Sequence, residues 1–514
     1  MTLFFIVVTG VLLRLYRLEV FSLWFDEADS VLSAIQPLQT LEMLKAGRVL
    51  VMHNLFLNFW KIIGVDEFRL RLSSVIFGVL AIIILYLLAK RVFDKKTALW
   101  SAFLLAISPF NIYYSQELRP YAMMVLLTIC TVYCFIKGWE EKRILYWSGY
   151  VIFAVLNFYT HWIAAFYFFT LIVYSVFWCR RDAGARKMFF ISNIIIVVLS
   201  VPWVWSLVRI SRLVIDRDSL FSQISIGWIP PVDYTSILWT LKNFTAGYSV
   251  NHFAAVTTLL LYGLFFFRGI FCSRDKQKIL LPLLLFIVPV ILLFGISKYR
   301  SCYIDRYLIA SCPFFCLIVA CGLKETKRIF SFFALVAFTV FSAWALTIQY
   351  NNFLAGSFIE HRGVQCKKQE RQAAEYILNN LEVEDGVFHV CRSTVLPFEF
   401  YFKYTDRLKM PPGKREHPQL LVFLKEENDS GVGLELCRYS LVTGDLDDRY
   451  VYRPVDVTVE DFDRIWLVFS EWDFVLASKP GSLENKMLEV LKKNYRIEDL
   501  KQFSGVIVYL FIKK

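Results

Sequence analysis

Charged residues are scarce in this chain of 514 residues: only 19% are Asp, Glu, Lys or Arg, whereas 57% are hydrophobic. A soluble protein of this length usually carries more charge and divides its apolar residues among several cores. Here the apolar residues form long runs instead, among them 75–89, 190–205 and 279–296, long enough to cross most or all of a bilayer. This pattern excludes an ordinary soluble protein.

Patterns typical of a zinc site or of a removed leader are also missing. None of the 11 cysteines forms a CxxC pair or a Cys/His spacing that suggests zinc, so we expect them mostly to pack as small core residues. The apolar segment 3–13 has no basic region before it and no small-residue cleavage site after it. We therefore expect a retained first helix.

Positive charge is present in excess, with a net charge of +12. Much of it lies in short clusters between apolar runs, as the positive-inside rule produces, and not on one basic face or tail. This distribution argues against a nucleic-acid partner. Five basic loops fall on one side of the predicted topology, which we assign to the cytoplasm: 90–96, 137–143, 180–187, 268–278 and 324–328.

The apolar runs predict a polytopic α-helical membrane protein with about eleven spans. The predicted spans are 1–18, 70–90, 97–114, 120–137, 145–160, 162–179, 188–206, 252–270, 279–296, 307–323 and 329–348. The N-terminus is then cytoplasmic, and the C-terminal tail is not.

The composition changes after residue 350, where short helix and strand signals alternate. Helices are predicted at 367–380 and 483–495, and strands at 386–391, 419–424, 464–469 and 505–512. We therefore expect two domains, a transmembrane domain at 1–350 and a soluble α/β domain at 351–514.

An acidic motif, LWFDEADS at 23–30, follows the first predicted span. It places Asp26 and Glu27 beside Trp24 and Phe25 at the membrane surface. A carboxylate in such a low-dielectric position is suited to act as a general base on an incoming hydroxyl. The alternative is a solvated loop with an aromatic interface anchor, which the spacing alone favours.

Two more polar motifs fall on the same predicted side. YYSQELRPY at 113–121 carries Glu117 and Arg119, which form either a local ion pair ahead of Pro120 or an acid and a phosphate-binding cation in a shared pocket. FYTHW carries His161 between two spans; a lone histidine is more often structural than a ligand or a base.

The basic loop 297–306, SKYRSCYIDR, breaks the charge rule on that side. Its Lys298, Arg300 and Arg306 are either interface cations that reach towards water or a clamp for a phosphodiester or pyrophosphate. Because all these motifs fall on one face, they indicate a site for a lipid-phosphate substrate. A divalent cation is possible there, since carboxylates and a histidine can hold one or simply hydrogen-bond.

Five motifs in matching order resemble the bacterial membrane glycosyltransferases of the GT-C superfamily over roughly residues 1–350. The motifs are LWFDEADS after a first helix that ends in RLYRLEV, then FRLRLSSVIFGVL, YYSQELRPY, FYTHW and DRYLIASCP. Similar families are the dolichyl-phosphate-mannose–protein mannosyltransferases and the lipid A aminoarabinose transferase. The resemblance implies a multi-pass protein of the plasma (inner) membrane with an extracytoplasmic C-terminal domain.

The resemblance also implies roles for individual residues. Asp26 matches the catalytic base, Glu27 its partner, and Glu117 a second acid that binds substrate or a cation. Arg119, His161 and Arg306 match positions near the donor phosphate, and Lys298 and Arg300 lie close to Arg306 in sequence. The proline-rich patch of the family is replaced here by MHNLF at 52–56, so that His53 stands where a proline is common.

The predicted function is transfer of a sugar from a polyprenyl-phosphate donor to a hydroxyl of a glycolipid, polysaccharide or protein on the non-cytoplasmic face. The mechanism implied is a single displacement with inversion, in which Asp26 is the base and the lipid phosphate leaves. The alternatives are a transporter or flippase of a lipid-linked sugar, which needs no base, and an assembly subunit whose tail binds a cell-wall polymer.

Overall fold

The computed structural model describes residues 2–35, 51–178, 182–215, 229–272, 276–352, 366–382, 385–390, 392–404, 420–428, 431–440, 451–454, 459–470 and 483–514. It divides the chain into two compact units. The helical unit comprises Met1–Leu18, Met43–Phe56 and Arg71–Gln365, and the mixed unit comprises Glu19–Glu42, Leu57–Leu70 and Cys366–Lys514. The predicted domain boundary between 350 and 351 stays a prediction.

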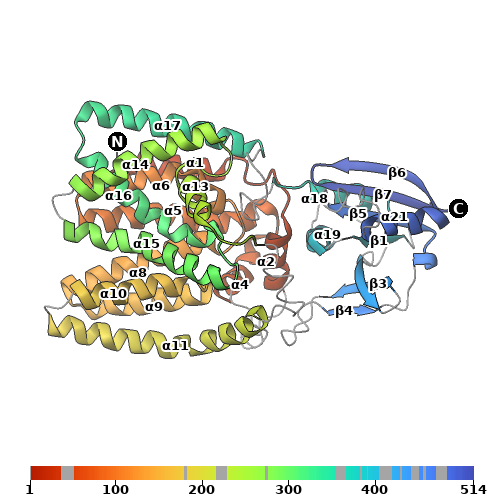
Figure 1. Ribbon diagram of the computed structural model, residues 1–514, viewed down its shortest axis with the longest axis horizontal. Helices are drawn as coiled ribbons and strands as arrows, with labels where there is room; N and C mark the ends of the chain where they lie inside the picture. The colour runs from red at the N-terminus through yellow and green to blue at the C-terminus, as the bar shows by residue number, and fades with distance from the viewer. Residues whose placement is uncertain are drawn as a thin grey trace. The chain divides into compact units, whose positions relative to one another are not determined.

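Helices dominate the chain before residue 351, and many of them run roughly parallel in Figure 1. They are α1 (Leu3–Leu15), α2 (Phe25–Ile35), α4 (Val51–Trp60), η1 (Lys61–Ile63), α5 (Glu67–Val92), α6 (Lys95–Ile107), α7 (Pro109–Ser115), α8 (Tyr121–Glu141), α9 (Ile144–Thr160), α10 (Ala164–Trp178), α11 (Ala183–Ile215), α13 (Tyr234–Ala246), α14 (His252–Cys272), α15 (Lys276–Tyr299), η2 (Asp305–Ser311), α16 (Cys312–Lys324) and α17 (Arg328–Tyr350).

Each of the eleven predicted spans contains helix. Among the described residues, seven segments are long and apolar enough to cross a membrane, and α1, α9 and the segment Ala164–Val176 are shorter apolar helices. The remaining predicted span, 97–114, is two helices, because α6 ends at Ile107 and Pro109 begins α7. Proline lacks an N–H and disfavours helix at the residue before it, which explains the break.

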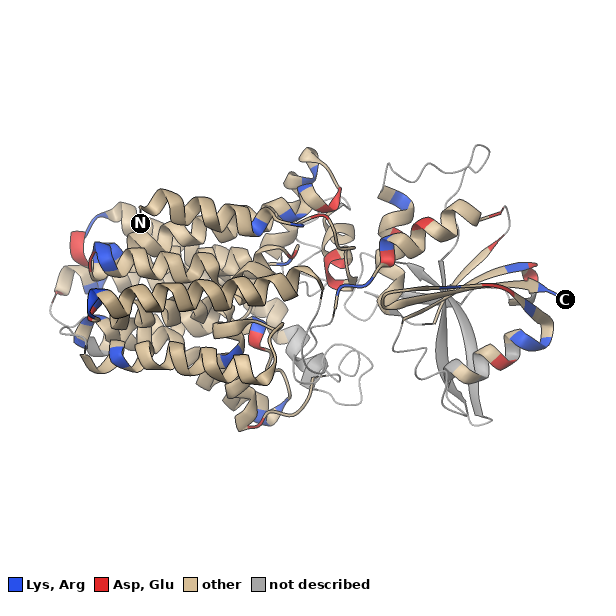
Figure 2. Ribbon diagram, turned by 90° about the horizontal axis from the view of Figure 1, so that it is seen from above, with Lys and Arg blue, Asp and Glu red and all other residues tan. Residues whose placement is uncertain are grey.

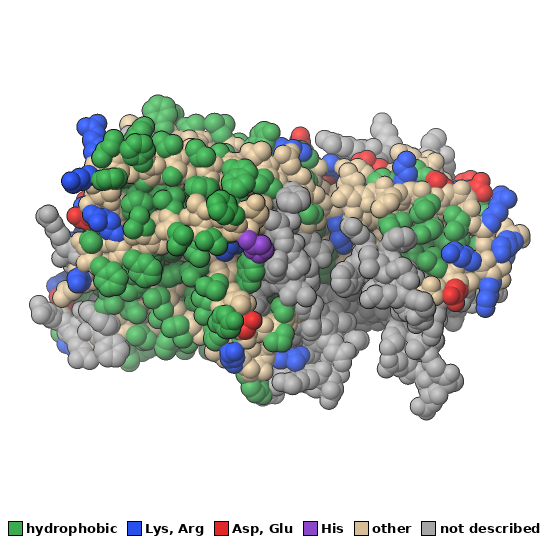
Figure 3. Space-filling model, turned by 45° about the horizontal axis from the view of Figure 1, so that its top comes forward, with side chains coloured by type: hydrophobic (Ala, Val, Ile, Leu, Met, Phe, Trp, Pro, Cys, Tyr) green, Lys and Arg blue, Asp and Glu red, His purple; other side chains and the backbone are tan. Residues whose placement is uncertain are grey.

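The outer surface of the helical unit is apolar, as Figure 3 shows. Large hydrophobic side chains are exposed along α11, α14 and α17, among them Phe190, Trp205, Phe253 and Phe332. Water disfavours so large an apolar surface, whereas a bilayer accommodates it. The chain is therefore a polytopic helical membrane protein.

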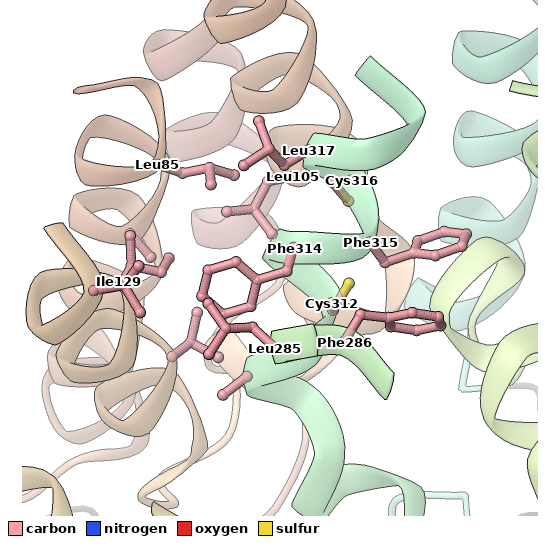
Figure 4. Close-up of a cluster of buried hydrophobic side chains, with 14 of the residues drawn as sticks. Leu85, Leu105, Ile129, Leu285, Phe286, Cys312, Phe314, Phe315, Cys316 and Leu317 are labelled. Carbon is pink, nitrogen blue, oxygen red and sulfur yellow. The ribbon is translucent and has the colours of Figure 1, made fainter. Parts of the chain in front are cut away.

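The centre of the helical unit is filled by one large cluster of buried hydrophobic side chains. Figure 4 shows Phe314 and Leu317 of α16 facing Leu85, Leu105 and Ile129 of three other helices. Close packing at another face of α16 depends on glycine: a Cβ on Gly322 would lie 2.0 Å from the carbonyl oxygen of Phe265 in α14. Small residues of this kind let helix backbones approach each other in membranes.

The basic loops are joined to one another at one end of the helical unit. Four contacts make these connections: Arg91 to Glu140 at 2.5 Å, Lys324 to Asp94 at 2.6 Å, the Arg268 guanidinium to the Glu325 carbonyl oxygen at 2.8 Å, and Lys142 to Asp182. Figure 2 shows charged residues at the ends of the helices and few between. The five loops therefore share one end, as predicted; their assignment to the cytoplasm stays a prediction.

At the other end, the break between α6 and α7 is closed by Arg14 of α1, whose side chain is fully buried. Its guanidinium donates to the carbonyl oxygens of Ala106 at 3.0 Å and Leu105 at 3.2 Å, and to Asn111 Oδ1 at 2.8 Å. These carbonyls belong to the last turn of α6, where helix geometry leaves them without intrahelical donors. Arg14 thereby fixes the direction of α7, which leads to Glu117 and Arg119.

The mixed unit contains a seven-stranded sheet with the order β4-β3-β2-β1-β5-β7-β6. The strands are β1 (Gly386–His389), β2 (Leu420–Asn428), β3 (Gly431–Ser440), β4 (Val451–Pro454), β5 (Arg464–Ser470), β6 (Tyr495–Phe503) and β7 (Val506–Lys513). Strand β1 pairs in parallel with β2 and β5, and the other neighbours are antiparallel. The helices of this part are α18 (Glu370–Asn380), α19 (Arg392–Tyr404) and α21 (Leu483–Asn494).

The predicted strands and helices of the tail are all present, so the α/β fold is confirmed. The prediction omitted α19, whose sequence RSTVLPFEFYFKY contains Pro397 and five aromatic residues. Aromatic residues favour strands, and proline disfavours the interior of a helix. The helix forms because one of its faces is buried, with Val395, Leu396, Phe398 and Tyr401 inaccessible to solvent.

Candidate functional site

The acidic motif begins a helix in the mixed unit. Phe25 starts α2, so Asp26 and Glu27 occupy its first turn. The exposed N–H groups of a helix start favour negative charge there. The two acids differ in environment: Asp26 is half-buried, whereas Glu27 is fully buried and its Oε2 lies 3.4 Å from the backbone nitrogen of Trp24. Asp26 is therefore the acid that a substrate can reach.

Helices of the tail fasten this motif within the mixed unit. The Tyr401 hydroxyl of α19 accepts from the Leu23 backbone at 2.7 Å and donates to Glu67 Oε1 at 3.0 Å. Arg371 of α18 forms an ion pair with the same Glu67 oxygen at 2.8 Å. Its guanidinium also donates to the carbonyl oxygens of Glu19 and Val20, both at 3.3 Å. The segment 19–23, which leads into α2, is thus held by contacts with both α18 and α19.

A cluster of cations lies in the helical unit, at the end opposite the basic loops. Burial and the positive charges of Arg119 and Arg306 lower the pKa of His161 to about 3. His161 ends α9, Arg119 precedes α8 and Arg306 lies in η2, so three separate segments meet here. Tyr307 packs on the imidazole with ring centroids 4.9 Å apart. The sequence motifs that predicted a phosphate site therefore converge in the fold.

His53 belongs to this cluster, although the sequence interpretation noted it only as a replacement for proline. Burial and the charge of Arg119 lower the pKa of His53 to about 3. Its side chain is 1% exposed, and its Nδ1 has no hydrogen-bond partner among the residues that the structure describes. A buried polar nitrogen without a partner is costly, so it is suited to bind a ligand.

Asp305 is a second residue that the sequence interpretation missed, although it precedes Arg306 in the IDRY motif. It is buried, and its Oδ2 accepts from Asn243 and, at 3.1 Å, from the Tyr248 hydroxyl. Its Oδ1 accepts from the Arg306 backbone nitrogen at 2.8 Å. Asp305 therefore fixes the start of η2 and the position of Arg306. The sequence did contain a signal for Asp305, namely an acidic residue directly before a predicted membrane span.

Glu117 is also buried, in the tight turn between α7 and α8. Glu117, Asp305 and Arg306 all lie close enough to the Tyr114 hydroxyl for their charges to influence it. The backbone carbonyl of Glu117 accepts from the Arg119 nitrogen at 2.8 Å, which keeps the turn closed. The structure thus brings Glu117 to the same cluster as the cations.

The two remaining predicted cations lie at the end of α15. Lys298, near the end of α15, is exposed; its ammonium group donates to the Val232 carbonyl oxygen at 3.1 Å and lies 5.0 Å from the Phe294 ring centre. Arg300 is half-buried just beyond α15. Among the residues that the structure describes, no group of three or more His, Cys, Asp or Glu could hold a metal ion. We assign no metal ligands.

Comparison with known proteins places these features in a family context. Residues 50–205 match the family model described as Dolichyl-phosphate-mannose-protein mannosyltransferase. No curated protein matches the chain.

Solved structures are similar over the whole length. ArnT from Cupriavidus metallidurans in the apo state gives a TM-score of 0.57 at 13% identity, covering 99% of this chain and 97% of that chain. The same protein bound to undecaprenyl phosphate gives the same values. At this identity the likeness shows the fold. The resemblance to the GT-C membrane glycosyltransferases is thus confirmed, by the mannosyltransferase family model over residues 50–205 and by the fold over the whole chain.

Proposed function

We propose that this protein is a glycosyltransferase that moves a sugar from a polyprenyl-phosphate donor to a hydroxyl acceptor. The observation that carries the proposal is the cluster of half-buried Arg119 with buried Arg306 and His161 at one end of the helical unit. Guanidinium groups in a low-dielectric site bind a phosphate strongly and stabilise the charge that develops on it as it leaves. A lipid carries its phosphate to this depth of the membrane, so the bilayer itself supplies the donor.

The proposed reaction is a single displacement. The acceptor oxygen forms a bond to the anomeric carbon while the bond from that carbon to the phosphate oxygen breaks. The electron pair goes to the lipid phosphate, held by Arg119 and Arg306, and the acceptor proton goes to Asp26. Asp26 is suited to this role because it is half-buried in the first turn of α2, where its carboxylate is favoured. The configuration at the anomeric carbon inverts.

The other site residues have supporting roles in this proposal. Glu27 is the buried partner of Asp26, and Glu117 helps bind the substrate near Tyr114. The uncharged imidazoles of His161 and His53 are hydrogen-bonding groups for the donor. Lys298 and Arg300, near the end of α15, attract the anionic headgroup from a greater distance.

The donor class has support from a protein of the same fold. ArnT from Cupriavidus metallidurans has been solved with undecaprenyl phosphate bound. We extend this to the present chain, and propose a polyprenyl phosphate as the lipid. The acceptor is a glycolipid, polysaccharide or protein.

The same proposal assigns the protein to the plasma (inner) membrane. The end of the helical unit that carries the basic loops faces the cytoplasm, as the positive-inside rule favours. The cluster and the soluble domain at 351–514 are then extracytoplasmic.

A transporter or flippase of a lipid-linked sugar is the alternative that the cation cluster also permits. Transporters commonly have helices that are interrupted near the middle of the membrane. α15 is continuous from Lys276 to Tyr299 although Pro282 and Pro289 lie inside it. The two functions differ in their need for Asp26.

The experiment compares Asp26→Asn with Asp29→Asn, which changes a second half-buried acid three residues along the same helix. The full chain in lipid nanodiscs is supplied with polyprenyl-phosphate mannose, with water as the acceptor hydroxyl, and release of free polyprenyl phosphate and mannose is measured by mass spectrometry. We expect Asp26→Asn to lower turnover at least 100-fold, as loss of a general base does, and Asp29→Asn to keep it. Wild-type turnover by Asp26→Asn would overturn the assignment of the base.

Cellular glycans identify the acceptor. A lipid and glycan profile of cells with and without the gene should show one glycoconjugate that loses a sugar. Unchanged glycoconjugates together with a lipid-linked sugar retained on the cytoplasmic face would favour the flippase.

A further inference from the structure

Glu370, the first residue of α18, is an acid buried in the mixed unit next to the acidic motif. Its side chain is 1% exposed, and the charge of Glu27, itself fully buried, acts on it. Two buried carboxyl groups that interact do not both ionise readily, because each negative charge raises the cost of the other. One of the two therefore keeps a proton over a wide range of pH.

The contacts of neighbouring residues explain why these two acids meet. On one side of Glu370, the Lys367 ammonium lies 5.3 Å from the centre of the Trp24 ring. On the other side, the backbone nitrogen of Arg371 donates to Ser22 Oγ at 3.1 Å. Ser22 in turn donates to Gln372 at 3.3 Å. The start of α18 is thus fastened to the residues just before α2, and this register brings Glu370 towards Glu27.

The surroundings favour the protonated form of Glu370. Burial is the main cause that raises its pKa to about 8; the charge of Glu27 also raises this pKa, whereas the charges of Lys368 and Lys367 lower it without cancelling the effect of burial. Arg371 points elsewhere, to Glu67. The charged groups of the other elements packed against α18 have partners of their own: Glu399 with Lys403, Arg496 with Glu498, Asp499 with Tyr376, Lys501 with the Tyr376 ring, and Lys513 with Asp463.

One oxygen of Glu370 has no hydrogen bond that the structure accounts for. Oε2 is buried, and no group among the described residues donates to it or accepts from it. A protonated carboxyl carries an O–H that can be donated, and a neighbouring carboxylate is the strongest acceptor available for it.

We infer that Glu370 is a positioning residue for the acidic motif. Its neutral carboxyl group places no second negative charge beside the buried Glu27, and it thereby keeps the first turn of α2, which carries Asp26, in position. The tail domain thereby contributes a side chain that the reaction depends on without touching the substrate. This inference rests on the proposed role of Asp26 as base.

The test uses Glu370→Gln and Glu370→Ala in the full chain in nanodiscs, with polyprenyl-phosphate mannose as the probe. Glutamine keeps a neutral hydrogen-bond donor, whereas alanine removes it. Wild-type turnover should fall as pH rises through about 8, because ionised Glu370 repels Glu27. Glu370→Gln should keep turnover at pH 7 and lose this alkaline decline.

Glu370→Ala should lower kcat at least 10-fold with little change in the KM of the donor. Glu399→Gln, which changes a paired acid of α19, is the matched control and should leave both the rate and the pH profile unchanged.

A second measurement does not depend on turnover or on the identity of the sugar. Infrared difference spectroscopy detects the C=O band of a protonated carboxyl group. We expect one such band in the wild type that titrates near pH 8 and is absent in Glu370→Gln. If Glu370→Ala fails to fold, the inference is tested by this infrared band and by the pH profile of Glu370→Gln.

The inference is overturned if Glu370→Gln keeps both the band and the wild-type alkaline decline. Its failure is distinguishable from failure of the proposed function. Turnover by Asp26→Asn removes the proposed function, whereas an inactive Asp26→Asn with an unaltered pH profile in Glu370→Gln removes this inference alone.

Discussion

The guanidinium of Arg119 lies close enough to His161 for its charge to help hold that imidazole neutral. The charge of the same guanidinium also acts on His53. Two buried, neutral histidines therefore lie near one half-buried cation. This relationship makes the stability of the protein sensitive to acid.

Lowering the pH should destabilise the protein through these histidines. Their pKa values are about 3 in the folded chain, below the ordinary histidine value of 6.5. Between those two values the unfolded chain binds protons that the folded chain does not, so the full contribution is present above pH 6.5 and is lost as pH falls. We expect the Tm of the wild type to drop from about pH 6.5 to about pH 4.5, and His161→Gln to show a shallower drop.

The control for this titration is His252→Gln, which changes an exposed histidine at the start of α14. Its Tm should follow the wild-type curve. Identical slopes for His161→Gln and the wild type would contradict the burial and charge that we assign to His161.

Replacing Arg306 by alanine should weaken binding of the donor phosphate. A hydrogen bond to a charged group contributes ~1.5–3 kcal/mol, which corresponds to roughly a 10- to 100-fold loss of affinity. The measurement is the Kd for undecaprenyl phosphate by native mass spectrometry of the full chain. Lys142→Ala is the control. Lys142 lies in a basic loop at the opposite end of the helical unit, so this variant should bind as the wild type does. Unchanged affinity in Arg306→Ala would remove Arg306 from the phosphate site.

Two glycines of α14 should differ sharply in their tolerance of alanine. A Cβ on Gly269 would lie 2.2 Å from the carbonyl oxygen of Ile318, whereas a Cβ on Gly263 meets no atom within 4 Å. Gly269→Ala should therefore force α14 and α16 apart and cost ~1–3 kcal/mol. Gly263→Ala should be neutral or slightly stabilising, since alanine favours helix. Thermal unfolding in detergent measures both, and equal Tm values would contradict the close approach.

Removing the buried guanidinium of Arg14 should destabilise the helical unit. Arg14→Leu leaves the carbonyl oxygens of Leu105 and Ala106 without these donors, and each buried unpaired group costs ~1–3 kcal/mol. The control Arg17→Leu loses a more exposed hydrogen bond to Asn351 and should change Tm little. The ratio of folded to aggregated protein in size-exclusion chromatography reports the difference. A monodisperse Arg14→Leu with wild-type Tm would show that the break after α6 needs no such support.

The membrane fold was largely predictable because its main signal is local. A run of apolar residues predicts a span without knowledge of any partner, and each predicted span proved to contain helix. Interruptions were harder to place. The break at Pro109 was merged into one span because apolar residues continue through it. α19 escaped notice because its aromatic residues resemble those of a strand, and only burial decides in favour of helix.

The nearness of Glu117, Arg119, His161 and Arg306 was predictable because each belongs to a sequence motif; their roles in a reaction stay predictions. Asp305 and His53 were missed as members of the cluster because their role depends on partners far away in sequence. Asn243 lies 62 residues from the Asp305 that it contacts. Glu370 is farther still from Glu27 in the sequence, and no local pattern marks either acid as part of a pair.

The side chain of Arg14 has a consequence for how the protein is made. Its guanidinium donates to the carbonyl oxygen of Ala106, which comes 92 residues later in the chain. At synthesis rates of roughly 5–20 residues per second, the first helix waits at the membrane for ~5–18 seconds before that partner emerges. During this interval the Gly10 carbonyl oxygen of α1 itself, 3.1 Å away in the folded structure, can accept from the guanidinium, but the carbonyl oxygens of α6 are not yet present. α1 therefore completes its packing only after α6 has emerged.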